Sequence, residues 1–172
     1  MLGHGVRRIE SPCDFFTGGQ PMTTKRFFLK AVAALALTAS ALPSFAAEAS
    51  DPAEGMIAIN YFRPDGNYTG WGLHAWIGNP GQPGTPIDGV DWFGPLKPAG
   101  KTDDAGVYWH VPHAAFGKSG FVNYIIHKGD TKEQGGKDMR FDGNTIKQVW
   151  VNSGDKTIYT SKAEAIAARQ AK

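Results

Sequence analysis

Short apolar runs, separated by clusters of glycine, proline, asparagine and aspartate, make up the chain from residue 56 to residue 160. The runs are rich in β-branched and aromatic residues, a composition that favours strands. No helical period lies between them, so the pattern predicts an all-β sandwich. We expect strands at MIAINYF (56–62), WGLHAWI (71–77), GVYWHVP (106–112), GFVNYIIHK (120–128), KQVWVN (147–152) and KTIYT (156–160).

The segments between these runs predict turns and loops. Asp65-Gly66 is typical of a hairpin turn between the first two strands. The prolines of residues 79–89 exclude a central strand, so we expect a loop there. Residues 128–142 are dense in charge and glycine and predict a second, polar loop.

The last residues, 161–172, predict a short helix in which Ser161 and Glu164 are spaced as a capping box. A helix of this length is not stable alone in water. It is expected either as a lid packed on the sandwich or as the start of a linker, and the sequence leaves both alternatives open.

The N-terminal region predicts export. Positive residues precede a short apolar run at 31–42, and Ser44-Phe45-Ala46 has the small residues that signal peptidase favours. A helix that spans a bilayer needs about 20 apolar residues, and no cysteine follows the run. We therefore expect a secreted or periplasmic protein without a membrane or lipoprotein anchor. The expected organisation is an over-long start or N-terminal extension (1–21), a signal peptide (22–46), a linker (47–55), the sandwich (56–160) and the helical tail or linker (161–172).

Composition narrows the possible partners of the mature region. Residues 47–172 hold 13 Lys and Arg against 14 Asp and Glu, a formal charge of −1. This charge argues against nucleic acid as a partner and against a polybasic membrane contact. The single cysteine, Cys13, lies in the part that is expected to be removed, so the domain must fold without disulfides. We expect it to be a monomer.

Neither catalysis nor metal binding is indicated. Asp103 and Asp104 are adjacent within a turn-like TDDAG, so we interpret them as turn formers rather than as the separated carboxylates of a glycosidase. No GxSxG motif is present in the mature region. The spacing of its histidines predicts surface or hydrogen-bonding roles, with no metal and no cofactor. These histidines are His74, His110, His113 and His127.

The strand predicted at 71–77 carries the main functional signal, because side chains alternate between the two faces of a strand. One face is apolar and is expected in the core, while the other exposes an indole beside an imidazole. Such a flat aromatic surface suits the apolar face of a sugar ring. The core set is Trp71, Leu73, Ala75 and Ile77, and the opposite set is Gly72, His74 and Trp76.

The remaining tryptophans divide by their phase along the strands. Trp109 is in phase with valines on both sides, so we expect it inside. Trp150 is out of phase with its valine neighbours and is expected to cover the other sheet. Trp92 lies in a loop and stays open to either interpretation. In the polar loop, Lys132 and Asp138 are predicted to reach over the exposed indole and bind sugar hydroxyls.

Taken in order, these motifs closely resemble the pullulanase-associated domain, carbohydrate-binding module family 41, from about residue 56 to residue 160. The matching residues are Tyr61, Arg63-Pro64-Asp65-Gly66, Tyr68, Gly70-Trp71, Leu73-His74, Trp76, Thr102-Asp103-Asp104, Gly106, Ile125 through Asp130, Lys132, Asp138, Val149-Trp150-Val151, Gly154-Asp155 and Ile158-Tyr159.

The resemblance implies an immunoglobulin-like β-sandwich that binds α-1,4-linked glucans such as amylose, amylopectin, glycogen or pullulan. Family members stack glucose on two aromatics spaced i, i+2 and hold its hydroxyls with a lysine and an aspartate. These positions correspond to His74, Trp76, Lys132 and Asp138. His74 departs from the family pattern, because it replaces a second indole and should weaken stacking.

Three interpretations follow from the resemblance. The first is a secreted, non-catalytic α-glucan-binding module. The second is an N-terminal fragment of a pullulanase-type hydrolase. The third is a structural sandwich that has lost sugar binding through the change at His74.

Overall fold

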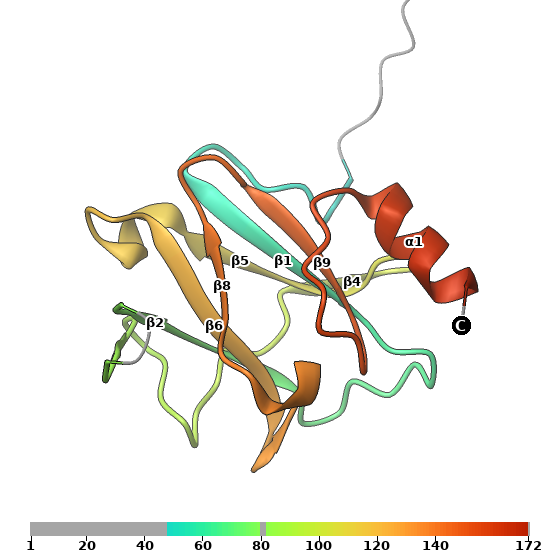
Figure 1. Ribbon diagram of the computed structural model, residues 1–172, viewed down its shortest axis with the longest axis horizontal. Helices are drawn as coiled ribbons and strands as arrows, with labels where there is room; N and C mark the ends of the chain where they lie inside the picture. Colours follow the sequence, from blue (N-terminus) through green and yellow to red (C-terminus); the bar gives the residue numbers. More distant parts are fainter. Residues whose placement is uncertain (1–47, 80–81, 172) are drawn as a thin grey trace, which may run out of the picture. The chain divides into compact units, whose positions relative to one another are not determined.

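Two β-sheets pack against each other in the part of the chain that the computed structural model describes, residues 48–79 and 82–171. The first sheet has the order β4-β5-β1-β9, and the second has the order β3-β2-β6-β7 with β8 paired to β6 (Figure 1). The all-β sandwich predicted from the sequence is confirmed. The elements are β1 (Met56–Phe62), β2 (Gly72–Ile77), β3 (Thr85–Pro86), β4 (Gly100–Thr102), β5 (Gly106–Pro112), η1 (His113–Phe116), β6 (Phe121–Lys128), β7 (Thr131–Lys132), η2 (Gln134–Gly136), β8 (Met139–Asp142), β9 (Gln148–Asn152) and α1 (Lys162–Gln170).

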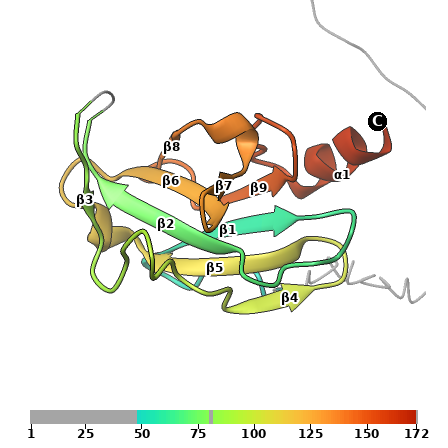
Figure 2. The same ribbon diagram turned by 90° about the horizontal axis from the view of Figure 1, so that it is seen from below.

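The register of the second sheet places its outward residues in rows. β2 pairs antiparallel with β6, so that Trp76 lies opposite Asn123. β6 pairs antiparallel with β8, so that Asn123 lies opposite Arg140. On the other side of β2 lies the short edge strand β3 (Figure 2). It brings Pro86 opposite Trp76. Pro86, Trp76, Asn123 and Arg140 therefore form one row across this sheet.

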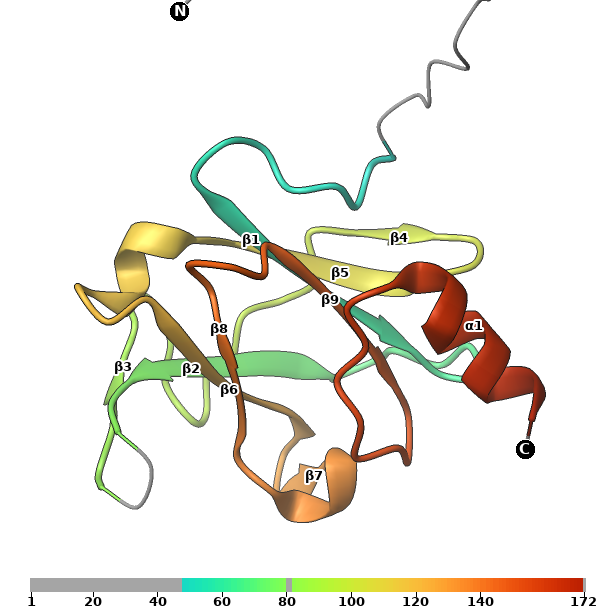
Figure 3. The same ribbon diagram turned by 45° about the horizontal axis from the view of Figure 1, so that its top comes forward.

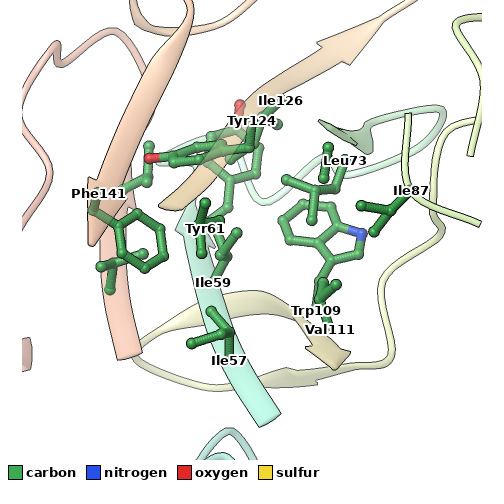
Figure 4. Packing of buried hydrophobic residues seen from close by; sticks show 14 of the residues in the cluster. Ile57, Ile59, Tyr61, Leu73, Ile87, Trp109, Val111, Tyr124, Ile126 and Phe141 are labelled. Atoms are coloured by element: carbon green, nitrogen blue, oxygen red, sulfur yellow. The ribbon is translucent and has the colours of Figure 1, made fainter. Parts of the chain in front are cut away.

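The core lies between the inner faces of the two sheets. Trp109, which is 1% exposed, packs with Leu73 and Ile87, and its Nε1 donates to the Leu96 carbonyl at 2.8 Å (Figure 4). This confirms the interior position predicted for Trp109. Ile77 was expected in the core but is 38% exposed, because it stands at the end of β2 where the first sheet no longer covers it.

The strand predictions are confirmed for the longest apolar runs. Three other segments differ from what the sequence predicts. The Asp65-Gly66 turn joins β1 to β2, which lie in different sheets, so it is not a hairpin. The run at 156–160 contributes only a bridge between Tyr159 and Trp150. The segment 128–142 is not one loop, because it contains β7, η2 and β8, and β7 and η2 project beyond the end of β6 (Figure 3).

Helix α1 packs on the first sheet beside β9 (Figure 3). Its Ser161 N-cap accepts a hydrogen bond from the Glu164 amide at 3.5 Å, as the capping motif predicts. Ala165 is fully buried and packs with Ala105 against Trp150. Of the two alternatives for this segment, the structure therefore has the packed helix. It also explains the phase of Trp150, which faces away from the main core toward α1 and does not cover the other sheet as expected.

Residues 1–47 lie outside the described residues, and with them the predicted extension at 1–21, the predicted signal peptide at 22–46 and Cys13. Within the described ranges, no helix is long and apolar enough to cross a membrane.

The packing of α1 on the sheet predicts that the same substitution changes stability differently at two alanines of the helix. Ala165→Asp places a charged carboxylate at a fully buried position against Trp150 and should lower the free energy of unfolding by about 2 kcal/mol or more. The matched variant Ala163→Asp changes an exposed position of the same helix and should stay within about 0.5 kcal/mol of the original. Urea unfolding measures both, and equal effects would contradict this packing.

Candidate functional site

A shallow depression of about 270 Å³ lies on the outer face of the second sheet. Strands β2 and β6 supply its floor, the loop before β3 supplies one wall, and the loop after residue 90 supplies the other. The lining residues are His74, Trp76, Gln82, Pro83, Gly84, Trp92, Ile125 and Asp138.

The alternation of β2 places two of these rings outward. Leu73 and Ala75 are fully buried, which obliges His74 and Trp76 to point away from the core. The centroids of the two rings are 5.6 Å apart with an interplanar angle of 33°. Both side chains are half-buried, so the orientation predicted from the strand period is confirmed.

Trp76 is held in place from the β3 side by Gly84. A Cβ at residue 84 would lie 1.8 Å from Cδ1 of the indole, a distance that no side chain tolerates. The backbone of this loop therefore packs directly against the Trp76 ring. Sequence reasoning treated residues 79–89 only as a loop, and the periodicity of β2 gives no signal for this contact.

Trp92 forms the opposite end of the depression. Its ring stacks on His127 with centroids 4.1 Å apart and an angle of 7°, and it meets His74 edge to face at 5.5 Å. Its Nε1 donates to Asp130 Oδ1 at 3.4 Å. The loop that carries it is shaped by Asp91, whose Oδ1 accepts the amides of residues 93 and 94 at 2.7 and 2.6 Å. The sequence left Trp92 undecided, and the structure places it at the site.

The surroundings of His74 favour the neutral form of its imidazole. Burial lowers the pKa of His74, and the nearby His127 adds to this effect, whereas Asp91 and Asp138 oppose it. His127 is itself buried, and its Nδ1 donates to the Gly129 carbonyl at 2.8 Å. A neutral His74 ring can donate or accept a hydrogen bond and offers a flat surface between the two indoles.

The two charged residues predicted for the site lie at different places around it. Asp138 is exposed and lines the depression. Lys132 is exposed outside it, with Nζ 5.1 Å from the centroid of the Trp92 ring. Within residues 48–79 and 82–171 neither is part of an ion pair. Both charges are therefore free to meet a ligand.

Lys132 is positioned by its neighbour Glu133, which is buried. The Glu133 carboxylate accepts hydrogen bonds from Arg63 Nη1 at 2.9 Å, Ser153 Oγ at 2.9 Å, the Gly154 amide at 3.0 Å and the Tyr61 hydroxyl. Its own amide donates to the Ile126 carbonyl at 2.9 Å. This network ties the β7–η2 segment to the C-terminal ends of β1 and β9 in the first sheet.

The network sets the ionisation of its members. Burial raises the pKa of Glu133, but the hydrogen bonds it accepts and the nearby Arg63 outweigh burial and lower the pKa below its usual range. Burial and the hydrogen bond to Glu133 raise the pKa of Tyr61, so its hydroxyl stays protonated and donates a hydrogen bond to Glu133.

The adjacent aspartates that were interpreted as turn formers lie away from the depression. Asp103 and Asp104 lie in the turn between β4 and β5, on the other sheet, and Asp104 pairs with Lys162 at 2.7 Å. The described part of the chain brings together no group of three histidine, cysteine, aspartate or glutamate residues that could hold a metal ion.

Comparison with known proteins adds a family and a fold. The sequence profile described as Bacterial pullanase-associated domain matches residues 55–160. An α-amylase of Streptomyces lividans is 40% identical over 75 residues, which cover 44% of this chain and 7% of the α-amylase.

Among solved structures, PulA from Klebsiella oxytoca matches with a TM-score of 0.55 and 26% identity, covering 74% of this chain and 13% of PulA. A structure described as α-glucan recognition by family 41 carbohydrate-binding modules from streptococcal virulence factors matches with a TM-score of 0.50 and 25% identity. That match covers 64% of this chain and 49% of the other. The chain thus spans less than half the length of each of these relatives.

The contact at Gly84 predicts that a single methyl group disturbs the site. Gly84→Ala should displace the Trp76 indole and shift its Nε1–H resonance, while the fold remains. Gly94→Ala is the matched control, because its added methyl meets Asp91 only at 3.4 Å. Two-dimensional NMR of the indole protons measures the effect, and an unmoved Trp76 signal in Gly84→Ala would contradict the packing.

The lowered pKa of Glu133 predicts a pH-dependent stabilisation. The unfolded carboxyl has a pKa of about 4.5, so the stabilisation is fully present above that pH and is lost as the pH falls through the lower pKa of the folded state. Glu133→Gln should lower the free energy of unfolding at pH 7 by about 1–3 kcal/mol, and the difference should shrink below pH 4.5. Denaturant titrations across pH 3–8 test this, with the exposed Glu54→Gln as control. A difference that is independent of pH would refute it.

Proposed function

The chain belongs to the bacterial pullulanase-associated domain family, and we propose on that basis that it is a non-catalytic module that binds α-1,4-linked glucans. One observation carries the proposal: Trp76, His74 and Trp92 line a single open depression together with a free carboxylate, Asp138. The solved family 41 modules are described as recognising α-glucan, which supports the same ligand class for this chain.

Stacking supplies the apolar part of binding. A pyranose face that covers roughly 50 Å² on each partner removes about 100 Å² from water, which is worth about 2.5 kcal/mol before ordering costs. Indoles suit this role because they offer a large, rigid apolar face.

Trp92 supplies the second indole that the sequence of β2 lacks. His74 is a smaller ring than an indole, and Trp92 lies edge to face against it at 5.5 Å. Because Trp92 is also stacked on the buried His127, its position is fixed before a ligand arrives. The change at position 74 is therefore accompanied by an aromatic from another loop, which argues against a sandwich that has lost sugar binding.

Polar groups at the rim orient the sugar. Asp138 accepts hydrogen bonds from hydroxyl groups, and Lys132 donates to them from above Trp92. The neutral His74 adds a group that either donates or accepts. Together with stacking, these contacts correspond to a dissociation constant between micromolar and millimolar, about −4 to −8 kcal/mol.

The proposal concerns binding alone. The α-amylase and pullulanase activities belong to relatives of which this chain spans 7% and 13%. Export of the module is proposed from the signal-like sequence at residues 22–46.

Replacing either indole should remove binding. Trp76→Ala and Trp92→Ala are each expected to lose at least tenfold in affinity for amylose or pullulan in affinity gels, because each removes one stacking surface. Lys132→Ala and Asp138→Ala should lose less, since an exposed hydrogen bond is worth less than a stacked ring.

Phe93→Ala is the matched control. Phe93 follows Trp92 in the same loop and is 96% exposed, but it does not line the depression. It should retain the original mobility shift. Full retention in Trp76→Ala, or equal loss in Phe93→Ala, would place the site elsewhere.

A further inference from the structure

We infer that the sugar-binding surface continues past Trp76 into a second subsite organised by Arg140, and that the module therefore requires a chain of at least three glucose units for full affinity. The inference rests on the proposed function and extends it to ligand length.

The position of Arg140 follows from strand register. Trp76 on β2 is opposite Asn123 on β6, and Asn123 is opposite Arg140 on β8. Cross-strand partners in an antiparallel sheet share a face, so all three side chains point to the same outer surface. The row leads from the first depression across the sheet to Arg140.

A second depression of about 140 Å³ lies along this row. It shares Trp76, Gln82 and Asp138 with the first depression, and Arg140 lines it at the far end. The two hollows therefore adjoin at Trp76 and Asp138. When an unbranched glucan chain rests on Trp92 and Trp76, its next glucose unit reaches the second hollow.

The guanidinium of Arg140 stacks on an aromatic ring but has a buried nitrogen without a hydrogen-bond partner in the described part of the chain. Its Cζ lies 3.9 Å from the centroid of the Phe121 ring, a stacked arrangement that fixes the plane of the group. Its Nη1 is buried and has no hydrogen-bond partner among the residues that the structure describes. No carboxylate in those ranges forms an ion pair with it, although Asp138 and Asp142 precede and follow it by two residues.

Arg140 as a whole is only partly buried and lines the hollow, so the accessible part of its guanidinium can donate to acceptors that a ligand supplies there. Arginine presents its N–H groups in a planar fork, which matches oxygens on adjacent atoms. The neighbouring hydroxyls of a glucose unit have this arrangement. Asn123 borders the same hollow and is itself fixed, because its Nδ2 donates to the carbonyls of Trp76 and Gly78 at 3.1 and 3.2 Å.

Calorimetry with maltose, maltotriose and maltotetraose tests this subsite. In the original chain, affinity should rise about tenfold or more between maltose and maltotetraose. Arg140→Met keeps an unbranched side chain on Phe121 but removes the donors, so it should bind maltose within twofold of the original and maltotetraose about tenfold more weakly. Lys118→Met removes an exposed positive charge and should match the original on every ligand.

The outcomes separate the two proposals. If the original chain binds none of these sugars, the proposed function fails and the subsite with it. If it binds them but Arg140→Met is unchanged, or loses affinity equally for all lengths, the subsite alone is refuted. A second readout does not depend on the variant: the Arg140 side-chain N–H resonances of the original chain should shift with maltotetraose and not with maltose, and the opposite result also refutes it.

Discussion

The burial of alternate residues along β2 is the constraint on which the rest of the site depends. Leu73 and Ala75 fill the space between the sheets. Because side chains alternate along a strand, the residues next to them must point outward. A shift of one residue would bury the imidazole and the indole and expose the core. The same packing that stabilises the sandwich therefore also presents His74 and Trp76 to solvent.

The parts of the site outside the strands depend on contacts between segments that are distant in sequence. Trp92 is fixed by His127, and the Trp76 ring is fixed by Gly84. The loop with Lys132 is fixed by the bonds from Arg63, Tyr61 and residues 153–154 to a single buried carboxylate. These contacts make the surface rigid before a ligand arrives, which reduces the ordering cost of binding.

Sequence periodicity predicted the elements that are long and apolar, and it failed where structure depends on tertiary contacts. Strands β1 and β5 have the predicted bounds because each is a run of β-branched and aromatic residues that ends at turn residues. Strand β8 was taken as part of a loop, because it has only two apolar residues, Met139 and Phe141, which alternate with the outward-facing Arg140 and Asp142 inside a charged, glycine-rich segment. Trp92 stayed undecided for a related reason: a loop has no period, and nothing in the local sequence identifies His127 as its partner.

The distribution of the five tryptophans has a practical consequence. Trp71, Trp109 and Trp150 are at most 9% exposed, whereas Trp76 and Trp92 are half-buried at one surface. A dissolved quencher such as iodide reaches only the latter pair, so the quenchable share of the intrinsic emission comes from the site itself. The protein thus carries its own optical reporter, and occupancy of the surface can be followed without any label.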